Sequence, residues 1–250
     1  MPDFTVLQWT LALLAAFCAG VSKAGLAGVG LLGVTFMAAA VPGKLSSGIV
    51  LPLLIFADLL AASAFRTHVQ WAQIRRLAWP VCLGIFAGWG LLMVIPDAAF
   101  RPIIGGMVLA MLTLQVVRQR FPGFDAALPH SRLFAWFSGL LTGTATMVAN
   151  AAGPIASTYL IILSLPKQQF VHTMAWLFLF VNIFKVPFSV HLGLINVGSL
   201  TLNLCLAPAV IVGLLAGKQL IDRVPQRLFQ TIVLWLATIS AVWLIASQFR

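Results

Sequence analysis

Apolar residues form two long stretches in this chain, and each long stretch is followed by three shorter ones. The long stretches span about Val6–Val41 and Leu133–Leu165. Each exceeds the roughly 20 residues that one membrane helix needs, and each carries small and polar residues at its centre. We therefore predict two broken helical hairpins. Arms of about 16 residues would reach roughly 24 Å, so we expect their tips to lie inside a membrane.

The shorter apolar stretches have the length of single membrane helices. They cover about Leu45–Phe65, Ala72–Ile95, Phe100–Val117, Val171–Val190, Val197–Ile221 and Leu228–Ala246. Together with the hairpins they predict an all-α fold, a polytopic transmembrane helical bundle. The polar stretch Arg118–Arg132, which contains Pro122 and Pro129, has the composition of a linker.

The two halves of the sequence resemble copies of one plan. Pro42 matches Pro166 and Asp58 matches Asn182, both at a separation of 124 residues. Two blocks recur at a separation of 129 residues, Gly84-x-x-Ala87-Gly88 with Gly213-x-x-Ala216-Gly217, and Ile95-Pro96-x-x-x-Phe100 with Val224-Pro225-x-x-x-Phe229. We therefore divide the chain into a first transmembrane repeat (1–120), a cytoplasmic linker (121–132) and a second transmembrane repeat (133–250).

The basic residues indicate how the two halves are oriented. If each long stretch crosses once, seven basic residues lie on one side and six on the other, which favours neither orientation. If each long stretch enters and returns, ten share one side and three oppose them. Basic residues accumulate on the cytoplasmic side, so the hairpin interpretation is favoured. Each half then makes an odd number of crossings, which predicts inverted repeats, a cytoplasmic linker and external termini.

The composition excludes several classes of protein. The chain is 61% apolar and 8% charged, whereas soluble domains are about a quarter charged. It has no Glu, and its net charge of +10 comes from scattered Lys and Arg, which is typical of cytoplasmic loops and not of nucleic-acid binding. No nucleophile–base pair, phosphate loop, paired acid or metal cluster is recognisable. We therefore expect no enzyme, no cofactor and no metal site.

The tip of the first hairpin combines a lysine with closely spaced glycines. Ser22 and Lys23 precede Gly25, Gly28 and Gly30. Glycine lets the backbone approach a ligand closely, and unpaired N–H groups at a helix start attract anions. We expect Ser22 to cap the following arm and Lys23 to contact the substrate. Close helix packing is the alternative role of the glycines, and snorkelling to the surface is the alternative for Lys23.

The tip of the second hairpin is polar but carries no charge. It contains the sequence Asn150-Ala-Ala-Gly153-Pro154. Proline suits the first turn of a helix, so a half-helix is predicted to begin there, with its N–H groups facing the tip. The candidate substrate-binding residues of this hairpin are Thr144, Thr146, Asn150, Gly153 and Ser157.

Three polar residues lie within the shorter apolar stretches. They are Asp58, Asn182 and Lys185, and we expect Lys185 to lie nearer a helix end than the others. Charges at membrane depth are costly and by default indicate function. We interpret the three residues as candidates for ion coupling. The alternative is a structural ion pair between Asp58 and a lysine.

The glycine-rich first hairpin with its closing Pro42-Gly43, the Asn150-Ala-Ala-Gly-Pro154 tip and the duplicated halves resemble the TauE/SafE (TSUP) sulfite exporter family, which includes the YfcA-like proteins. The likeness covers nearly the whole chain. The resemblance implies a multi-pass permease of the bacterial inner membrane for sulfite, sulfoacetate or other organosulfonates. The family's small, polar tips are kept, but Met147 stands where a second lysine would match Lys23.

The sequence therefore predicts a secondary transporter that holds a small sulfur-containing anion between the two tips at mid-membrane. The expected partners are this anionic substrate and membrane lipid, with no nucleic acid. Coupling to protons through Asp58 and assembly into a homo-oligomer are left open. An uptake permease for another organic anion and a non-transporting membrane scaffold are the alternatives.

Overall fold

The structure is a computed structural model of the 250-residue chain. It describes residues 4–24, 27–41, 43–64, 67–121, 123, 131–163, 165–223, 235, 238–239, 241–243 and 245–246. Gly25, Pro42 and most of the expected linker lie outside the described residues. Most of the expected last helix, 228–246, also lies outside them.

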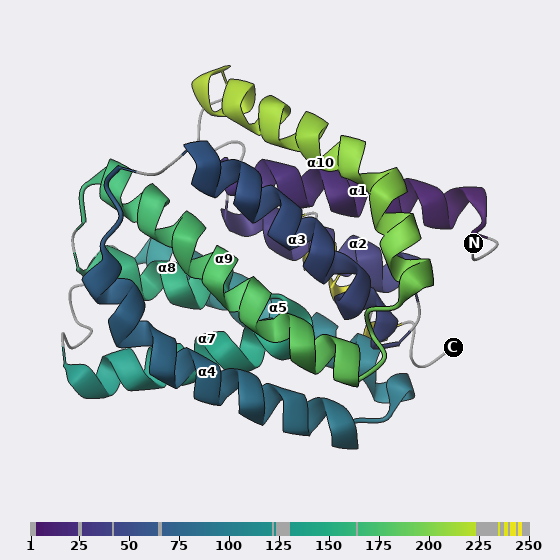
Figure 1. Ribbon diagram of the computed structural model, residues 1–250, viewed down its shortest axis with the longest axis horizontal. Coiled ribbons are helices and arrows are strands. Elements are labelled where there is room, and N and C mark those ends of the chain that lie inside the picture. Colours follow the sequence, from purple (N-terminus) through teal and green to yellow (C-terminus); the bar gives the residue numbers. More distant parts are fainter. Residues whose placement is uncertain are drawn as a thin grey trace.

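The described residues form helices and no strands, so the predicted all-helical bundle is confirmed (Figure 1). The helices are α1 (Val6–Lys23), α2 (Ala27–Ala40), α3 (Leu45–Ala64), α4 (Trp71–Val94), α5 (Asp97–Arg120), α7 (Arg132–Ala149), α8 (Gly153–Ile162), α9 (Lys167–His191) and α10 (Val197–Arg223). Six of the described helices are long and apolar enough to cross a membrane, namely α1, α3, α4, α5, α9 and α10. The chain is therefore a multi-pass membrane protein.

The first long apolar stretch folds into an antiparallel hairpin of α1 and α2. A capping box starts α1, because the Thr5 side chain accepts from the backbone of Gln8 and the Gln8 side chain accepts from the backbone of Thr5. The Gln8 amide nitrogen also donates to the carbonyl oxygen of Ala40 at 3.0 Å, which joins the start of α1 to the end of α2. Near the tip, Gly30 faces Ser22. The predicted first hairpin is therefore confirmed.

The second long apolar stretch is broken between α7 and α8. Ser131 caps α7, and the helix ends at Asn150, which has a left-handed backbone with φ 51°. Helix α8 begins at Gly153 and carries proline in its first turn, as predicted. With 14 and 10 residues, α2 and α8 are about 21 Å and 15 Å long, which is shorter than a hydrocarbon core of about 30 Å.

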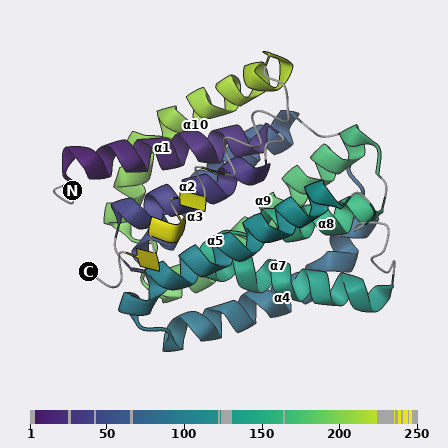
Figure 2. The ribbon, with the colours of Figure 1, turned by 180° about the vertical axis from the view of Figure 1, so that it is seen from behind.

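Each hairpin packs along a helix from the other half of the chain. Helix α10 lies beside α1, and α4 lies beside α7, at opposite edges of the bundle (Figures 1 and 2). Between these two pairs lie α2, α3, α5, α8 and α9, and two adjoining hydrophobic clusters fill the interior. Proline lies inside α3, α4, α5, α9 and α10. Helix α10 is bent (Figure 1), and Pro208 explains the bend because proline interrupts the hydrogen bonds of a helix.

Glycines bring the paired helices close together. A Cβ added at Gly20 of α1 would lie 2.1 Å from the carbonyl oxygen of Val210, and one at Gly143 of α7 would lie 2.1 Å from that of Val81. No side chain fits at either place, so the backbones touch across the interface. The glycines of the repeated block behave in the same way, since Gly84 meets the carbonyl oxygen of Leu140.

These contacts recur at constant separations. Gly20 and Gly143 are 123 residues apart, and their partners Val81 and Val210 are 129 residues apart. Gly213 meets the carbonyl oxygen of Phe17 just as Gly84 meets that of Leu140, again at separations of 129 and 123. Packing therefore accounts for the glycine blocks that recur in the sequence. The inverted relation of the two halves stays a prediction.

Candidate functional site

A cavity of about 130 Å³ lies where the two hairpin tips approach α3 and α9. Its polar lining comes from both tips and from the middle of these two helices. The residues concerned are Ser22, Lys23, Asp58, Thr146, Asn150, Ser157 and Asn182, and Gly30, Gly153 and Pro154 line the cavity beside them. The fold therefore brings residues from four separate segments to one place.

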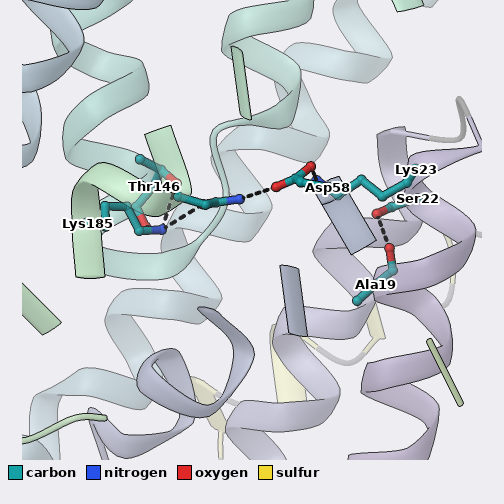
Figure 3. Close-up of polar contacts among 7 residues, drawn as sticks. Ala19, Ser22, Lys23, Asp58, Thr146 and Lys185 are labelled. Atoms are coloured by element: carbon teal, nitrogen blue, oxygen red, sulfur yellow. Dashed lines mark hydrogen bonds and ion pairs between the residues drawn. The ribbon is translucent and has the colours of Figure 1, made fainter. Parts of the chain in front are cut away.

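Lys23, at the end of α1, forms an ion pair with Asp58 of α3. The Lys23 ammonium lies 2.7 Å from Asp58 Oδ1, and the carboxylate is completely buried (Figure 3). That oxygen has no other hydrogen-bond partner among the described residues. The ammonium also lies 5.0 Å from the centre of the Phe178 ring, within cation–π range. The Lys23 side chain is 12% exposed, so the pair sits at the cavity wall.

Asn182 connects this ion pair to a second lysine. Its amide nitrogen donates to Asp58 Oδ2 at 2.7 Å, and its amide oxygen accepts from the Lys185 ammonium at 3.3 Å. Asp58 and Asn182 are the two residues that the repeat matches at a separation of 124, and they touch each other. A single amide thus orients a carboxylate on one side and an ammonium on the other.

Lys185 is buried at the second tip and has neutral partners in the described part of the chain. It is 1% exposed and donates to Thr146 O at 2.9 Å and Thr146 Oγ1 at 3.0 Å (Figure 3). It also donates to Asn150 Oδ1 at 2.6 Å. Lys185 lies six residues before the end of α9 at His191, and its side chain is nevertheless buried. A full turn and more of helix follows Lys185, so its ammonium reaches the centre of the bundle.

The backbone of the second tip explains why an asparagine stands at position 150. Asparagine tolerates the left-handed conformation better than most residues, and here it turns the chain out of α7. Its amide oxygen accepts from Lys185, while its amide nitrogen donates to the carbonyl oxygen and hydroxyl of Ser47 at 3.1 Å and 3.0 Å. The tip is therefore tied to both α9 and the start of α3.

Some of the predicted site residues lie apart from the cavity. Thr144 donates to the carbonyl oxygens of Gly84 and Leu140, so its hydroxyl joins the α4–α7 interface. Gly28 is buried in α2 and does not line the cavity, and Gly25 is outside the described residues. Ser22 lines the cavity, but its hydroxyl donates to Ala19 O at 2.7 Å within its own helix, and in the described residues it does not cap α2.

The sequence interpretation missed three residues that contact this site. Ser47 and Phe178 were not singled out, because a serine or a phenylalanine in an apolar helix carries no signal of its own. Arg118 was assigned to the linker, but it belongs to the last turn of α5 and donates to Ser157 Oγ at 3.3 Å. Arg118 lies two residues before the end of α5 at Arg120, and its long side chain could have indicated this inward reach.

The buried centre carries more positive than negative charge. Two lysines, Lys23 and Lys185, face one carboxylate, that of Asp58, at this centre in the described part of the chain. A buried charge that lacks an opposite charge is costly, so the arrangement favours an anion in the cavity. Among the described residues, no group of three His, Cys, Asp or Glu side chains could hold a metal ion. The geometry therefore offers anion binding.

Comparison with known proteins shows the family to which the chain belongs. No curated protein and no solved structure matches the chain. A family model described as "Sulfite exporter TauE/SafE" matches residues 12–244, which include the second hairpin, all but the first six residues of α1 and all of the cavity-lining residues. This chain therefore belongs to the TauE/SafE sulfite exporter family of multi-pass membrane transporters.

Proposed function

We propose that this protein is a secondary permease of the bacterial inner membrane for small sulfur-containing anions, either sulfite, sulfoacetate or another organosulfonate. The anion occupies the cavity between the hairpin tips. One observation carries the proposal: two buried or nearly buried lysines face one buried carboxylate beside that cavity. An anion supplies the missing negative charge, and membership of the sulfite exporter family supports the same class of cargo.

Both lysines contribute to binding in this proposal. Lys23 stands at the cavity wall and exchanges part of its contact with Asp58 for the anion. Lys185 stays with Thr146 and Asn150 and provides a fixed positive field, because its ammonium already has four acceptors within 3.3 Å. Electrostatic attraction is strong in this low-dielectric setting. Export follows from the membrane potential, which drives anions out of the cell.

Alternating access in this proposal uses the two segments 1–120 and 133–250 as inverted repeats. The moving bodies combine both segments, because α10 packs on the first hairpin and α4 packs on the second. One body contains α1, α2 and α10, and the other contains α4, α7 and α8. The cavity lies between them, so rocking of one body against the other opens it to either side.

Binding and flux measurements on the full-length protein test the proposal. Purified protein in lipid nanodiscs should bind sulfite and methanesulfonate in calorimetry, and proteoliposomes should release radiolabelled sulfite when a positive-outside potential is applied. A Lys44→Met variant serves as a control, because Lys44 pairs with Asp97 at 3.7 Å and lies away from the cavity lining. Absence of anion binding and flux would refute the proposal and favour a non-transporting scaffold.

A further inference from the structure

The cavity between the tips has a polar end and an apolar wall. Besides Pro154 at the second tip, nine apolar side chains from three helices line it: Leu31 and Val34 of α2, Leu54 and Ala61 of α3, and Phe170, Val171, Met174, Ala175 and Phe178 of α9. An inorganic oxyanion would contact only the polar end of the cavity, and the apolar wall would stay in contact with water. Sulfite would therefore leave much of the burial energy of the cavity unused.

We infer that the site is built for an organic monoanion with one charged head and a short apolar body, such as a short alkanesulfonate. This inference rests on the proposed function and narrows its substrate class. The head lies at Lys23, Asn182 and the second tip. The apolar body lies against α9, between Phe170 and Phe178.

The order of residues along α9 supports this orientation. Phe170, Met174 and Phe178 are spaced by four residues, so they lie on one face of the helix. Asn182 continues the same face one turn later, and Lys185 follows it. The lining of α9 therefore changes from apolar to polar along the helix, as an amphiphilic ligand requires.

Phe178 and Lys23 mark the boundary between the two parts. The ammonium lies 5.0 Å from the ring centre and 2.7 Å from the Asp58 carboxylate. A head group at Lys23 therefore stands directly beside an aromatic side chain of the apolar wall. A carbon atom bonded to that head would contact the ring without leaving the cavity.

The volume of the cavity limits the size of the ligand. A volume of about 130 Å³ holds a compact molecule of roughly six or seven heavy atoms. A sulfonate head has four heavy atoms, which leaves room for two or three carbon atoms. Ethanesulfonate and propanesulfonate fit this limit, whereas longer chains must extend beyond the cavity.

The buried charges favour one negative charge over two. Lys23 and Lys185 exceed Asp58 by one charge, so a monoanion balances the buried centre. A dianion such as sulfoacetate, with its sulfonate at the polar end, would place its carboxylate against the apolar wall, where an unpaired charge is costly. Arg118 donates to Ser157 Oγ at 3.3 Å, on the α8 side of the cavity.

A homologous series of ligands tests this inference. Binding of methane-, ethane-, propane- and butanesulfonate is measured by calorimetry on the full-length protein in nanodiscs, with sulfite and sulfoacetate as comparators. We expect affinity to rise about fourfold with each methylene up to propanesulfonate, and then to level off. Sulfoacetate should bind less tightly than propanesulfonate.

A matched pair of variants locates the apolar contact. Met174→Gln keeps the length of the side chain but makes it polar. The increase in binding affinity with each added methylene should therefore fall by half or more. Met174→Leu keeps the wall apolar and should preserve the gain. If Met174→Gln does not fold, Val171→Thr provides a second polar variant of nearly the same shape.

The outcomes separate this inference from the proposed function. Equal affinity for all alkanesulfonates, or tighter binding of sulfite or sulfoacetate than of propanesulfonate, would overturn the inference and leave an anion permease intact. An unchanged gain per methylene in the folded polar variant would also overturn it. Absence of binding by every anion would refute the proposed function itself.

Discussion

The two hairpin tips reach the same cavity with different sources of positive charge. The first tip carries its own cation, Lys23, which is paired with the buried carboxylate of Asp58. The second tip has Thr146 and Asn150, and its cation, Lys185, comes from α9 and is held by neutral groups. The sequence match places Met147 opposite Lys23, whereas the separation of 123 residues that the glycine contacts share places Thr146 there.

This comparison shows how one site can become asymmetric while its framework stays regular. The lysine missing from the second tip is replaced by a lysine from a neighbouring helix, so both tips have an ammonium. Only one of the two has a counter-ion. In the function we propose, this difference gives Lys23 a mobile role, in which substrate displaces Asp58 from its ammonium, and gives Lys185 a static role.

The largest expected effect comes from removing Lys23 alone. Lys23→Met leaves Asp58 buried without its counter-ion, and we expect a loss of about 3–5 kcal/mol in the free energy of unfolding. The double variant Lys23→Met with Asp58→Asn removes both charges and should recover most of that loss. Denaturant unfolding in detergent micelles measures both values. Equal stability of the single and double variants would contradict the ion pair.

Removing Lys185 should have a smaller effect on stability. Lys185→Met deprives Thr146, Asn150 and Asn182 of a donor, which costs about 1–3 kcal/mol, but it leaves no buried charge newly unpaired. The same unfolding assay, applied to Lys23→Met and Lys185→Met together, shows which lysine contributes more to the free energy of unfolding. A loss equal to or greater than that of Lys23→Met would show that Lys185, rather than Lys23, carries the main counter-ion contact of Asp58.

Removing the carboxylate should change anion affinity in the opposite direction. Asp58→Asn raises the net positive charge of the buried centre by one, so anion binding should tighten by roughly tenfold. The effect should be larger for sulfite than for methanesulfonate, because sulfite can carry two charges. Calorimetry with both anions measures the difference, and weaker binding of both would exclude Asp58 as the competitor of substrate.

The smallest expected effect concerns the backbone of the second tip. Asn150→Ala and Asn150→Gly both remove the amide, but alanine also forces a left-handed backbone onto a residue with a Cβ. The free energy of unfolding of Asn150→Ala should therefore be about 1 kcal/mol lower than that of Asn150→Gly. Thermal unfolding of the two variants measures this difference. Equal melting temperatures would show that the tip relaxes away from φ 51°.

The sequence identified the polar residues that line the cavity, but not its apolar wall. Interruptions in long apolar stretches located both tips, because polar and small residues inside hydrocarbon are uncommon without a reason. Asp58 and Asn182 were found for the same reason. The repeat showed that Asp58 and Asn182 occupy matching positions in the two halves, but it did not indicate that their side chains touch.

The structure assigned roles that the sequence left open. The recurring glycines serve helix packing between the halves, and Thr144 belongs to that interface. Whether a small or hydroxyl-bearing residue faces a ligand or a neighbouring helix depends on helix rotation, which small residues do not reveal in a uniformly apolar sequence.

The sequence by itself determined the membrane class, the hairpins and the presence of a few costly polar residues, because each of these follows from the local cost of placing polar groups in hydrocarbon. The pairing of those residues was decided by tertiary structure alone. Lys23 and Asp58 are 35 positions apart, Lys185 and Thr146 are 39 apart, and only the packing of α3 and α9 against the tips joins them. Ion pairing depends on distances of a few ångströms, and those distances exist only after the helices have packed.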